Sequence, residues 1–209
     1  MRIAKFGHAC LFVETDDARV LIDPGVFSSG LEAVGDLTAI LITHAHGDHL
    51  DVNHVAKLVA ANPGVGIFGD IDSARTLVEA GIQAQSVEPG QKLDVGTTVE
   101  VVGRDHAVIH PDLPRLINHG YLIGERLFHP GDALTIPGRD VDVLALPIGA
   151  PWLKSSEFID YLRAVKPRRA VPIHDAVLAM PQMSHNLVAQ LGPRETEYVV
   201  IENGQSAEV

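Results

Sequence analysis

The sequence has little of several residue types, and each shortage argues against a class of protein. A single cysteine, Cys10, among 209 residues leaves no partner for an internal disulfide bond. A reducing compartment is therefore favoured, and we expect a cytoplasmic protein. No stretch approaches the roughly 20 consecutive apolar residues that a membrane-spanning helix needs. The first residues also lack the continuous apolar core of a signal peptide, so no membrane association is expected.

Basic residues are also scarce. The chain has 16 Lys and Arg against 27 Asp and Glu, which gives a formal net charge of -11. A strongly acidic protein does not gain from counterion release on a polyphosphate strand, so binding to long nucleic acids is not expected. The charge does not exclude a small anionic substrate that is drawn to bound cations, because such ions dominate the local field. We therefore expect a small-molecule substrate as partner, and the sequence says nothing about the oligomeric state.

The remaining composition is that of an ordinary folded protein, with 46% hydrophobic and 21% charged residues. The pattern of strands followed by helices occurs twice, with no linker-like stretch between. It predicts one α/β domain over 1–209, built from two similar halves of about 1–115 and 116–209. The second helix is expected to have Asp72 as its N-cap. The expected strands are 2–6, 10–14, 19–23, 38–43, 97–102, 121–123, 126–128, 141–146 and 170–173, and the expected helices are 52–61, 72–80, 155–165 and 183–191.

A dense group of histidines and aspartates follows the continuous apolar run 38–43, which is expected to be a strand buried on both faces. Two histidines that lie two residues apart on an extended segment can point the same way. A glycine turn then lets an aspartate and a third histidine be presented from the following loop. Imidazole and carboxylate are preferred ligands of zinc and neighbouring metals, and four such side chains would be costly to bury without a metal. The segment, which predicts a metal site rather than a solvated polar loop, is Thr43-His44-Ala45-His46-Gly47-Asp48-His49-Leu50-Asp51.

This His-x-His-x-Asp-His pattern after a buried strand resembles the signature of the metallo-β-lactamase superfamily. Four further features extend the resemblance over nearly the whole chain. They are Asp23 in Leu21-Ile22-Asp23-Pro24, His106 at the end of the strand 97–102, Asp132 in Phe128-His129-Pro130-Gly131-Asp132, and His174 in Val171-Pro172-Ile173-His174. The resemblance implies an α/β fold, the four-layer αββα sandwich of that superfamily.

The resemblance also implies two divalent metal ions as cofactors. His110 is an alternative to His106 as the third ligand of the first metal. Asp23 is expected to orient a ligand rather than bind metal, although it could be a plain turn residue. Histidines with two carboxylates suit Zn, Mn or Fe, so the metal stays open. The implied ligands are His44, His46 and His106 for the first metal and Asp48, His49 and His174 for the second, with Asp132 between them.

The activity implied by the resemblance is that of a binuclear metal-dependent hydrolase, in which a metal-bound hydroxide attacks a small ester, lactone or phosphodiester. Asp48 would be the catalytic residue that orients the hydroxide and passes a proton to the leaving group. The chain is most similar to the small hydrolases of the superfamily that include ascorbate-phosphate lactonase. Two alternatives remain, a phosphodiesterase rather than a lactonase, and a non-catalytic metal-binding or sensor protein. A sensor would be marked by a lost ligand, and none is missing.

Substrate contacts are less marked in the sequence. His8 follows the first strand in a Gly-His turn and either faces the site or lies on the surface. Arg115 lies in a segment with two prolines and could contact an anion. Trp152 could stack on a ring or lie in an exposed loop, and Lys154 could contact an anion. Cys10 is expected to be a small core residue, and the histidines expected to be structural are His54, His129 and His185.

Overall fold

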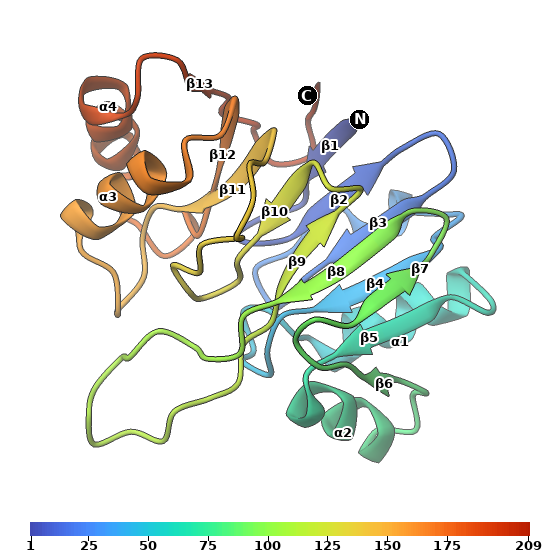
Figure 1. The fold of residues 1–209 in the computed structure, drawn as a ribbon. Helices are drawn as coiled ribbons and strands as arrows, with labels where there is room; N and C mark the ends of the chain where they lie inside the picture. The colour runs from blue at the N-terminus through green and yellow to red at the C-terminus, as the bar shows by residue number, and fades with distance from the viewer.

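Two mixed seven-stranded sheets form the centre of the molecule (Figure 1). The computed structural model describes all residues, 1–209. The order of the first sheet is β14 (Ser206–Glu208), β1 (Arg2–Lys5), β2 (Leu11–Glu14), β3 (Arg19–Ile22), β4 (Ala39–Ile42), β5 (Gly66–Gly69) and β6 (Gln85–Ser86). The order of the second is β13 (Glu197–Tyr198), β12 (Arg169–Ile173), β11 (Val143–Pro147), β10 (Leu127–His129), β9 (Gly120–Ile123), β8 (Thr98–Val102) and β7 (Lys92–Asp94).

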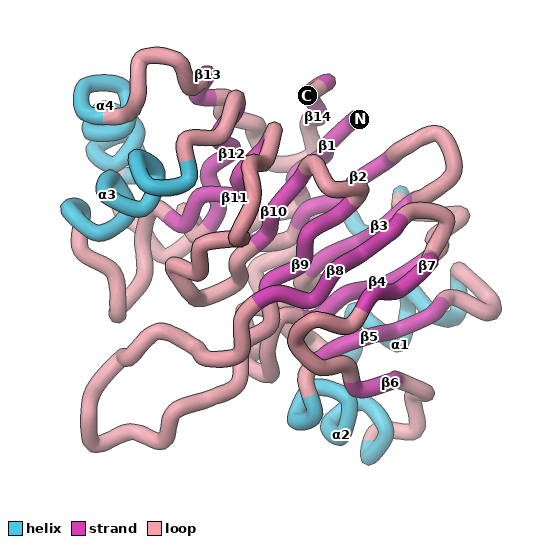
Figure 2. Tube along the Cα trace, in the orientation of Figure 1, coloured by secondary structure: helices cyan, strands magenta, loops and turns pink.

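Helices cover the outer face of each sheet (Figure 2). The layers are therefore helix, sheet, sheet, helix, as in the expected αββα sandwich. None of the helices combines the length and the apolar character that crossing a membrane requires. The helices are α1 (Val52–Ala61) and α2 (Ile71–Glu79) over the first sheet, α3 (Ser155–Val165) and α4 (Pro181–Leu191) over the second, and the short 3-10 helix η1 (Leu31–Ala33).

The strand β4 shows why the sheets hold together. Its side chains alternate between two apolar cores, because successive residues of a strand point to opposite faces. Ala39 and Leu41 lie in the core of 22 buried residues between the sheets. Ile40 and Ile42 lie in a second core against the helices α1 and α2. All four are fully buried, which confirms the prediction of a strand buried on both faces.

One sequence-based expectation about a helix boundary was wrong. The N-cap of α2 is Asp70, because its carboxylate accepts the backbone N–H groups of Asp72 and Ser73. The chain passes from the first sheet to the second between β6 and β7. The strand β8 pairs with β7 and β9 in the second sheet, whereas β14 returns to pair with β1 in the first.

The directions of the strands place one set of ends at a common edge. In the first sheet β1, β3 and β4 run the same way, since β2 lies antiparallel to its two neighbours. In the second sheet β8, β10 and β12 do so for the same reason, with β9 antiparallel between β8 and β10. The residues that follow these six strands carry the histidines and aspartates described next.

Candidate metal centre

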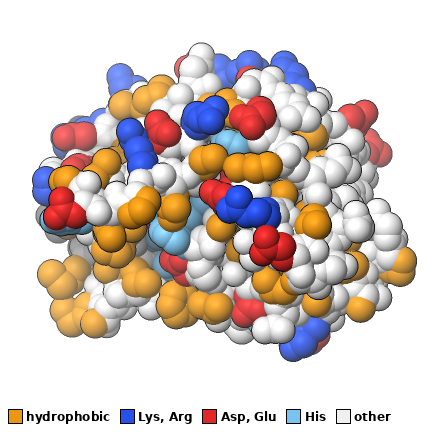
Figure 3. Space-filling model, turned by 90° about the horizontal axis from the view of Figure 1, so that it is seen from below, with side chains coloured by type: hydrophobic (Ala, Val, Ile, Leu, Met, Phe, Trp, Pro, Cys, Tyr) orange, Lys and Arg blue, Asp and Glu red, His pale blue; other side chains and the backbone are white.

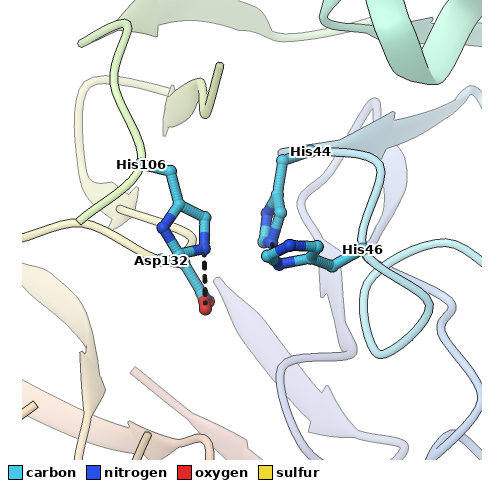
Figure 4. A group of neighbouring side chains, drawn as sticks. All are labelled: His44, His46, His106 and Asp132. Atoms are coloured by element: carbon cyan, nitrogen blue, oxygen red, sulfur yellow. Dashed lines mark hydrogen bonds and ion pairs between the residues drawn. The ribbon is translucent and has the colours of Figure 1, made fainter. Parts of the chain in front are cut away.

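The loop after β4 presents two histidines to each other. The Nε2 atom of His44 and the Nδ1 atom of His46 lie 3.0 Å apart (Figure 4). A tight turn follows, in which the N–H groups of His49 and Leu50 donate to the carbonyl of His46. Asp51 then accepts two backbone N–H groups and caps the helix α1. The strand, the turn and the helix cap therefore fix the loop on both sides of the motif.

The second sheet contributes His106 and Asp132 to the same place, and Figure 4 shows them opposite the two histidines of the motif. The Nε2 atom of His106 lies 3.3 Å from Oδ2 of Asp132. One ligand atom from each of these four residues lies within 4.8 Å of the others. His110, the alternative third ligand, instead has an exposed side chain beside Asp112 and does not belong to the group.

A second group comprises His8, His49 and His174, whose ligand atoms also lie within 4.8 Å of one another. Asp132 joins the two groups. Its Oδ1 atom lies 2.9 Å from Nε2 of His49 and 2.6 Å from Nε2 of His174, while its Oδ2 faces His106. One carboxylate therefore has an oxygen toward each group, the position expected of Asp132 between two metals.

His8 has a more central place than the sequence indicated. Its side chain is 1% exposed, its ring centroid lies 4.2 Å from that of His174, and its Nε2 lies 3.2 Å from Oδ2 of Asp48. Asp48 itself lies 3.9 Å from Nε2 of His49 and groups with His44 and His49. The surface alternative for His8 is therefore wrong. The available signal was its position shortly after the end of a strand, as for His44 after β4.

Several of these atoms lack a hydrogen-bond partner, which tests whether a metal would fit. They lie close together without the angles of a hydrogen bond, although a buried polar atom left unsatisfied costs about 1–3 kcal/mol. A cation among them would satisfy them together, and nitrogen and carboxylate oxygen are donors that first-row metals accept. The residues present therefore fit a metal centre. The unpartnered atoms are His8 Nδ1, His49 Nε2, His106 Nε2, Asp132 Oδ1 and His174 Nε2.

Asp23 orients His49, one of the ligand histidines, through the ring nitrogen Nδ1. Its Oδ2 lies 2.6 Å from Nδ1 of His49, and its two oxygens accept the backbone N–H and the hydroxyl of Thr43. The carboxylate thereby turns Nε2 of His49 toward the centre. This is the placement expected of an orienting carboxylate, and Asp23 is fully buried.

Burial and charge set the protonation of the centre. Burial lowers the pKa of His8, His44 and His46, so these rings favour the neutral form that can bind a metal. Burial opposes charge on Asp132 and His49 as well. The charges of Asp132 and Asp23 nevertheless hold the pKa of His49 well above its usual value, and those of His174 and His49 hold the pKa of Asp132 well below its usual value.

The pKa of Asp48 is lowered, as is that of Asp132. Burial alone would raise its pKa, but the hydrogen bond with His8 and the nearby His49 lower the pKa of Asp48 to about 2. Asp48 is therefore ionised at neutral pH. Its side chain is 29% exposed, unlike the buried ligands around it.

The remaining predicted contacts have different outcomes. The indole N–H of Trp152 donates to Oδ2 of Asp132 at 2.8 Å, so this side chain supports the metal centre directly. Arg115 lies beside the centre and lines a hollow together with His46 and His106. The side chain of Lys154 is 81% exposed and lies by Glu157 at the start of α3, so its contact with an anion stays a prediction.

The histidines expected to be structural all have partners outside the centre. His54 and His129 contact the backbone carbonyls of Gly25 and Ala9. His185 contacts the hydroxyl of Tyr198. None of the three belongs to a metal-ligand group.

The backbone is constrained where the site residues leave the strands. His8, Asp23 and His174 have φ of 51°, 49° and 66°, a left-handed region that residues other than glycine seldom adopt. Gly25 makes the closest approach, because a Cβ atom there would lie 1.9 Å from the carbonyl oxygen of Asp48. The turn after β3 therefore packs directly on the motif loop.

Comparison with known proteins agrees with this geometry. Residues 2–174 match the model of a family described as the beta-lactamase superfamily domain. The chain belongs to this superfamily. Protein Rv0786c of Mycobacterium tuberculosis is 48% identical over 185 residues, which cover 86% of each chain. A UPF0173 metal-dependent hydrolase of Methanopyrus kandleri is 28% identical over the whole of both chains.

A solved structure supports the fold of this beta-lactamase superfamily member. The metallo-beta-lactamase fold protein YhfI of Bacillus subtilis superposes with a TM-score of 0.75 at 17% identity, covering 99% of each chain. The resemblance to the metallo-β-lactamase superfamily and the αββα fold are therefore both confirmed.

Proposed function

We propose that this protein is a metal-dependent hydrolase with two divalent ions at the edge where the sheets meet. The observation that carries the proposal is the position of Asp132, whose two oxygens face separate groups of ligand nitrogens. His44, His46 and His106 would hold one ion. His49 and His174, with Asp48 or His8, would hold the other. The name of the similar Methanopyrus kandleri protein, a metal-dependent hydrolase, agrees with this function.

Two such ions supply Lewis acidity and lower the pKa of a bound water toward neutrality. The chain supplies positioning and proton transfer. Asp48 is ionised and partly exposed, so its carboxylate would orient the attacking water and transfer a proton to the leaving oxygen. The Nε2 atom of His8 lies 3.2 Å from Oδ2 of Asp48 and fixes this carboxylate. The indole N–H of Trp152 donates a hydrogen bond to Asp132, which stabilises the charge of this carboxylate and fixes its orientation.

The proposed substrate is a small ester, lactone or phosphodiester. The test uses protein that is stripped of metal, reloaded with Zn or Mn, and assayed against paired lactones and phosphodiesters. We expect turnover of one class to return with metal, and His46→Ala to lower it more than about 100-fold, since even residues that only support a ligand contribute 10–100-fold. His185→Ala is the matched control, because this histidine lies outside the centre.

Two results would contradict parts of this proposal. Binding of one ion per chain at saturation would exclude the binuclear centre. Binding of two ions without turnover of any substrate in the panel would favour the non-catalytic metal-binding or sensor protein.

A further inference from the structure

A hollow of about 550 Å³ lies beside the metal centre, and we call it the apolar pocket. Its inner wall includes His46 and His106, and most of the rest comes from residues 107–116 of the long loop between β8 and β9. Figure 1 shows this loop projecting from the body of the molecule. Figure 3 shows histidine side chains in a hollow with hydrophobic side chains on its rim. Since two metal-site histidines line the pocket, a molecule bound at the metals has direct access to it.

The loop exposes three large apolar side chains at the pocket. Val108, Ile109 and Leu113 are 55%, 39% and 54% exposed. Apolar side chains gathered on a concave surface mark a binding site more often than a random part of the surface. The base of the loop is held in place, because the N–H of His106 donates to Leu116 and that of Ala107 donates to Asp132.

The pocket has no unbalanced positive charge. Arg115 is the one Lys or Arg side chain that lines it, and its guanidinium lies 3.7 Å from Asp105. His110 also lines it, with Nδ1 3.7 Å from a carboxylate oxygen of Asp112. A phosphate group would meet compensated charges here, in a chain of net charge -11. An uncharged, apolar group suits these walls better.

We propose that the apolar pocket binds the acyl chain of an uncharged ester or lactone whose carbonyl lies at the metal centre. This substrate class rests on the proposed hydrolase function. In the reaction, the hydroxyl of water adds to the carbonyl carbon and the carbon–oxygen ester bond breaks. One proton of the water goes to the leaving alcohol oxygen. The carboxylic acid that forms releases its remaining proton to solvent, so the product is a carboxylate whose chain remains in the pocket.

The experiment measures binding of the product type by calorimetry on Zn-loaded protein, with butyrate, hexanoate and octanoate. Each methylene that is fully removed from water strengthens binding by about fourfold. Burial of even two of the four additional methylenes should therefore make octanoate bind at least about tenfold more tightly than butyrate. Leu113→Asn should reduce this dependence on chain length. Leu191→Asn, at a similarly exposed leucine on the far end of α4, should leave it unchanged. Val108→Thr, which keeps the side-chain shape, should reduce it as well.

The outcomes separate this proposal from the function on which it rests. Equal dissociation constants for the three carboxylates would overturn the pocket assignment, whatever the enzyme hydrolyses. A clear dependence on chain length without turnover of any ester, lactone or phosphodiester would retain the pocket and overturn the hydrolase. A change of oligomeric state in Leu113→Asn, measured by sedimentation, with no chain-length dependence in the unaltered protein, would show instead that the loop contacts a second copy.

Discussion

Asp132 contacts ligands of both groups in the metal centre. Its Oδ1 faces His49 and His174, and its Oδ2 faces His106 and accepts the indole N–H of Trp152. Such a carboxylate cannot shift toward one group without moving from the other. The geometry of both groups therefore depends on this one side chain and on the residues that hold it.

Substitution of Asp23 tests whether a carboxylate that orients a metal ligand contributes to metal affinity. Asp23→Asn removes the charge that holds Nδ1 of His49, so we expect metal affinity to fall by about 10–100-fold. The measurement is competition with a chromophoric chelator. Asp16→Asn, a substitution of an exposed aspartate, is the control and should leave the affinity unchanged. Equal affinities in the two variants would exclude an orienting role for Asp23.

The buried thiol of Cys10 predicts a pH dependence of the free energy of unfolding that does not involve the metal ligands. Burial raises the pKa of its thiol to about 12 in the folded chain, against about 8.5 in an unfolded one. Below pH 8 both states keep the proton. Between pH 8 and 10 the unfolded state loses it first, so the free energy of unfolding should fall by about 2 kcal/mol from this group. Urea titrations should show this extra loss in the unaltered protein relative to Cys10→Ala, and parallel pH profiles would contradict it.

Among the elements, the turn after β3 and the loop after β4 form one packed unit. A Cβ atom at Gly25 would collide with the backbone at Asp48, whereas a Cβ at Gly47 would meet nothing within 4 Å. The glycine that the loop needs is therefore Gly25, although the sequence drew attention to Gly47. The contact joins two segments that no local pattern connects.

These two glycines give a matched pair of variants. Gly25→Ala should displace the motif loop, lower the free energy of unfolding by about 1–3 kcal/mol and weaken metal binding. Gly47→Ala, in the motif loop after β4, should change neither the free energy of unfolding nor metal binding. The measurements are urea unfolding of the metal-free proteins and a metal titration of each. Similar behaviour of the two variants would show that the loop tolerates movement at Asp48.

The elements that the sequence predicted well carry their signal locally. β4 is a continuous apolar run, because a strand buried on two faces has apolar residues at every position. α3 lies over the expected 155–165, because burial of one helical stripe leaves a clear periodicity. β6 and β13 have two residues each and depend on a neighbouring strand for their pairing. A stretch of that length has no periodicity of its own, so the sequence could not indicate it.

In the site, too, residues with a local signal were predictable and contacts between distant segments were not. The histidines of the motif were predictable because they lie together after one strand, whereas His8 is separated from Asp48 by forty residues. Trp152 was expected either at the substrate or in an exposed loop, yet it donates to Asp132 from a loop of the second half. Long-range contacts of this kind depend on how the sheets pack. The sequence shows which residue types are present and not which of them meet.

At the scale of the whole molecule, the metal centre joins the two sheets. His44, His46 and His49 follow a strand of the first sheet, and His106 and His174 follow strands of the second. Ions held by both sets would connect the layers at one edge. The core of 22 residues between the sheets does not include these ligands, so the fold should persist without metal.

Metal removal should therefore lower thermal stability without unfolding the chain. At an ion concentration 100 times the dissociation constant, binding contributes about 2.7 kcal/mol, which corresponds to roughly 5–10 °C in Tm for a chain of this size. Differential scanning calorimetry with and without a chelator measures the shift. His174→Ala should abolish most of it, whereas His185→Ala should keep it. An unfolded metal-free protein would contradict this expectation.

Because Trp152 donates a hydrogen bond to Asp132, its fluorescence should report whether the metal centre is occupied. Trp152 is the only tryptophan of the chain, and its ring centroid lies 6.2 Å from that of His106 and 6.4 Å from that of His174. All indole fluorescence therefore originates beside the metal centre. Filling the centre with Co or Cu should quench the emission, and Zn should change its intensity without quenching by energy transfer. The occupancy of the centre can thus be followed in unlabelled protein by emission alone.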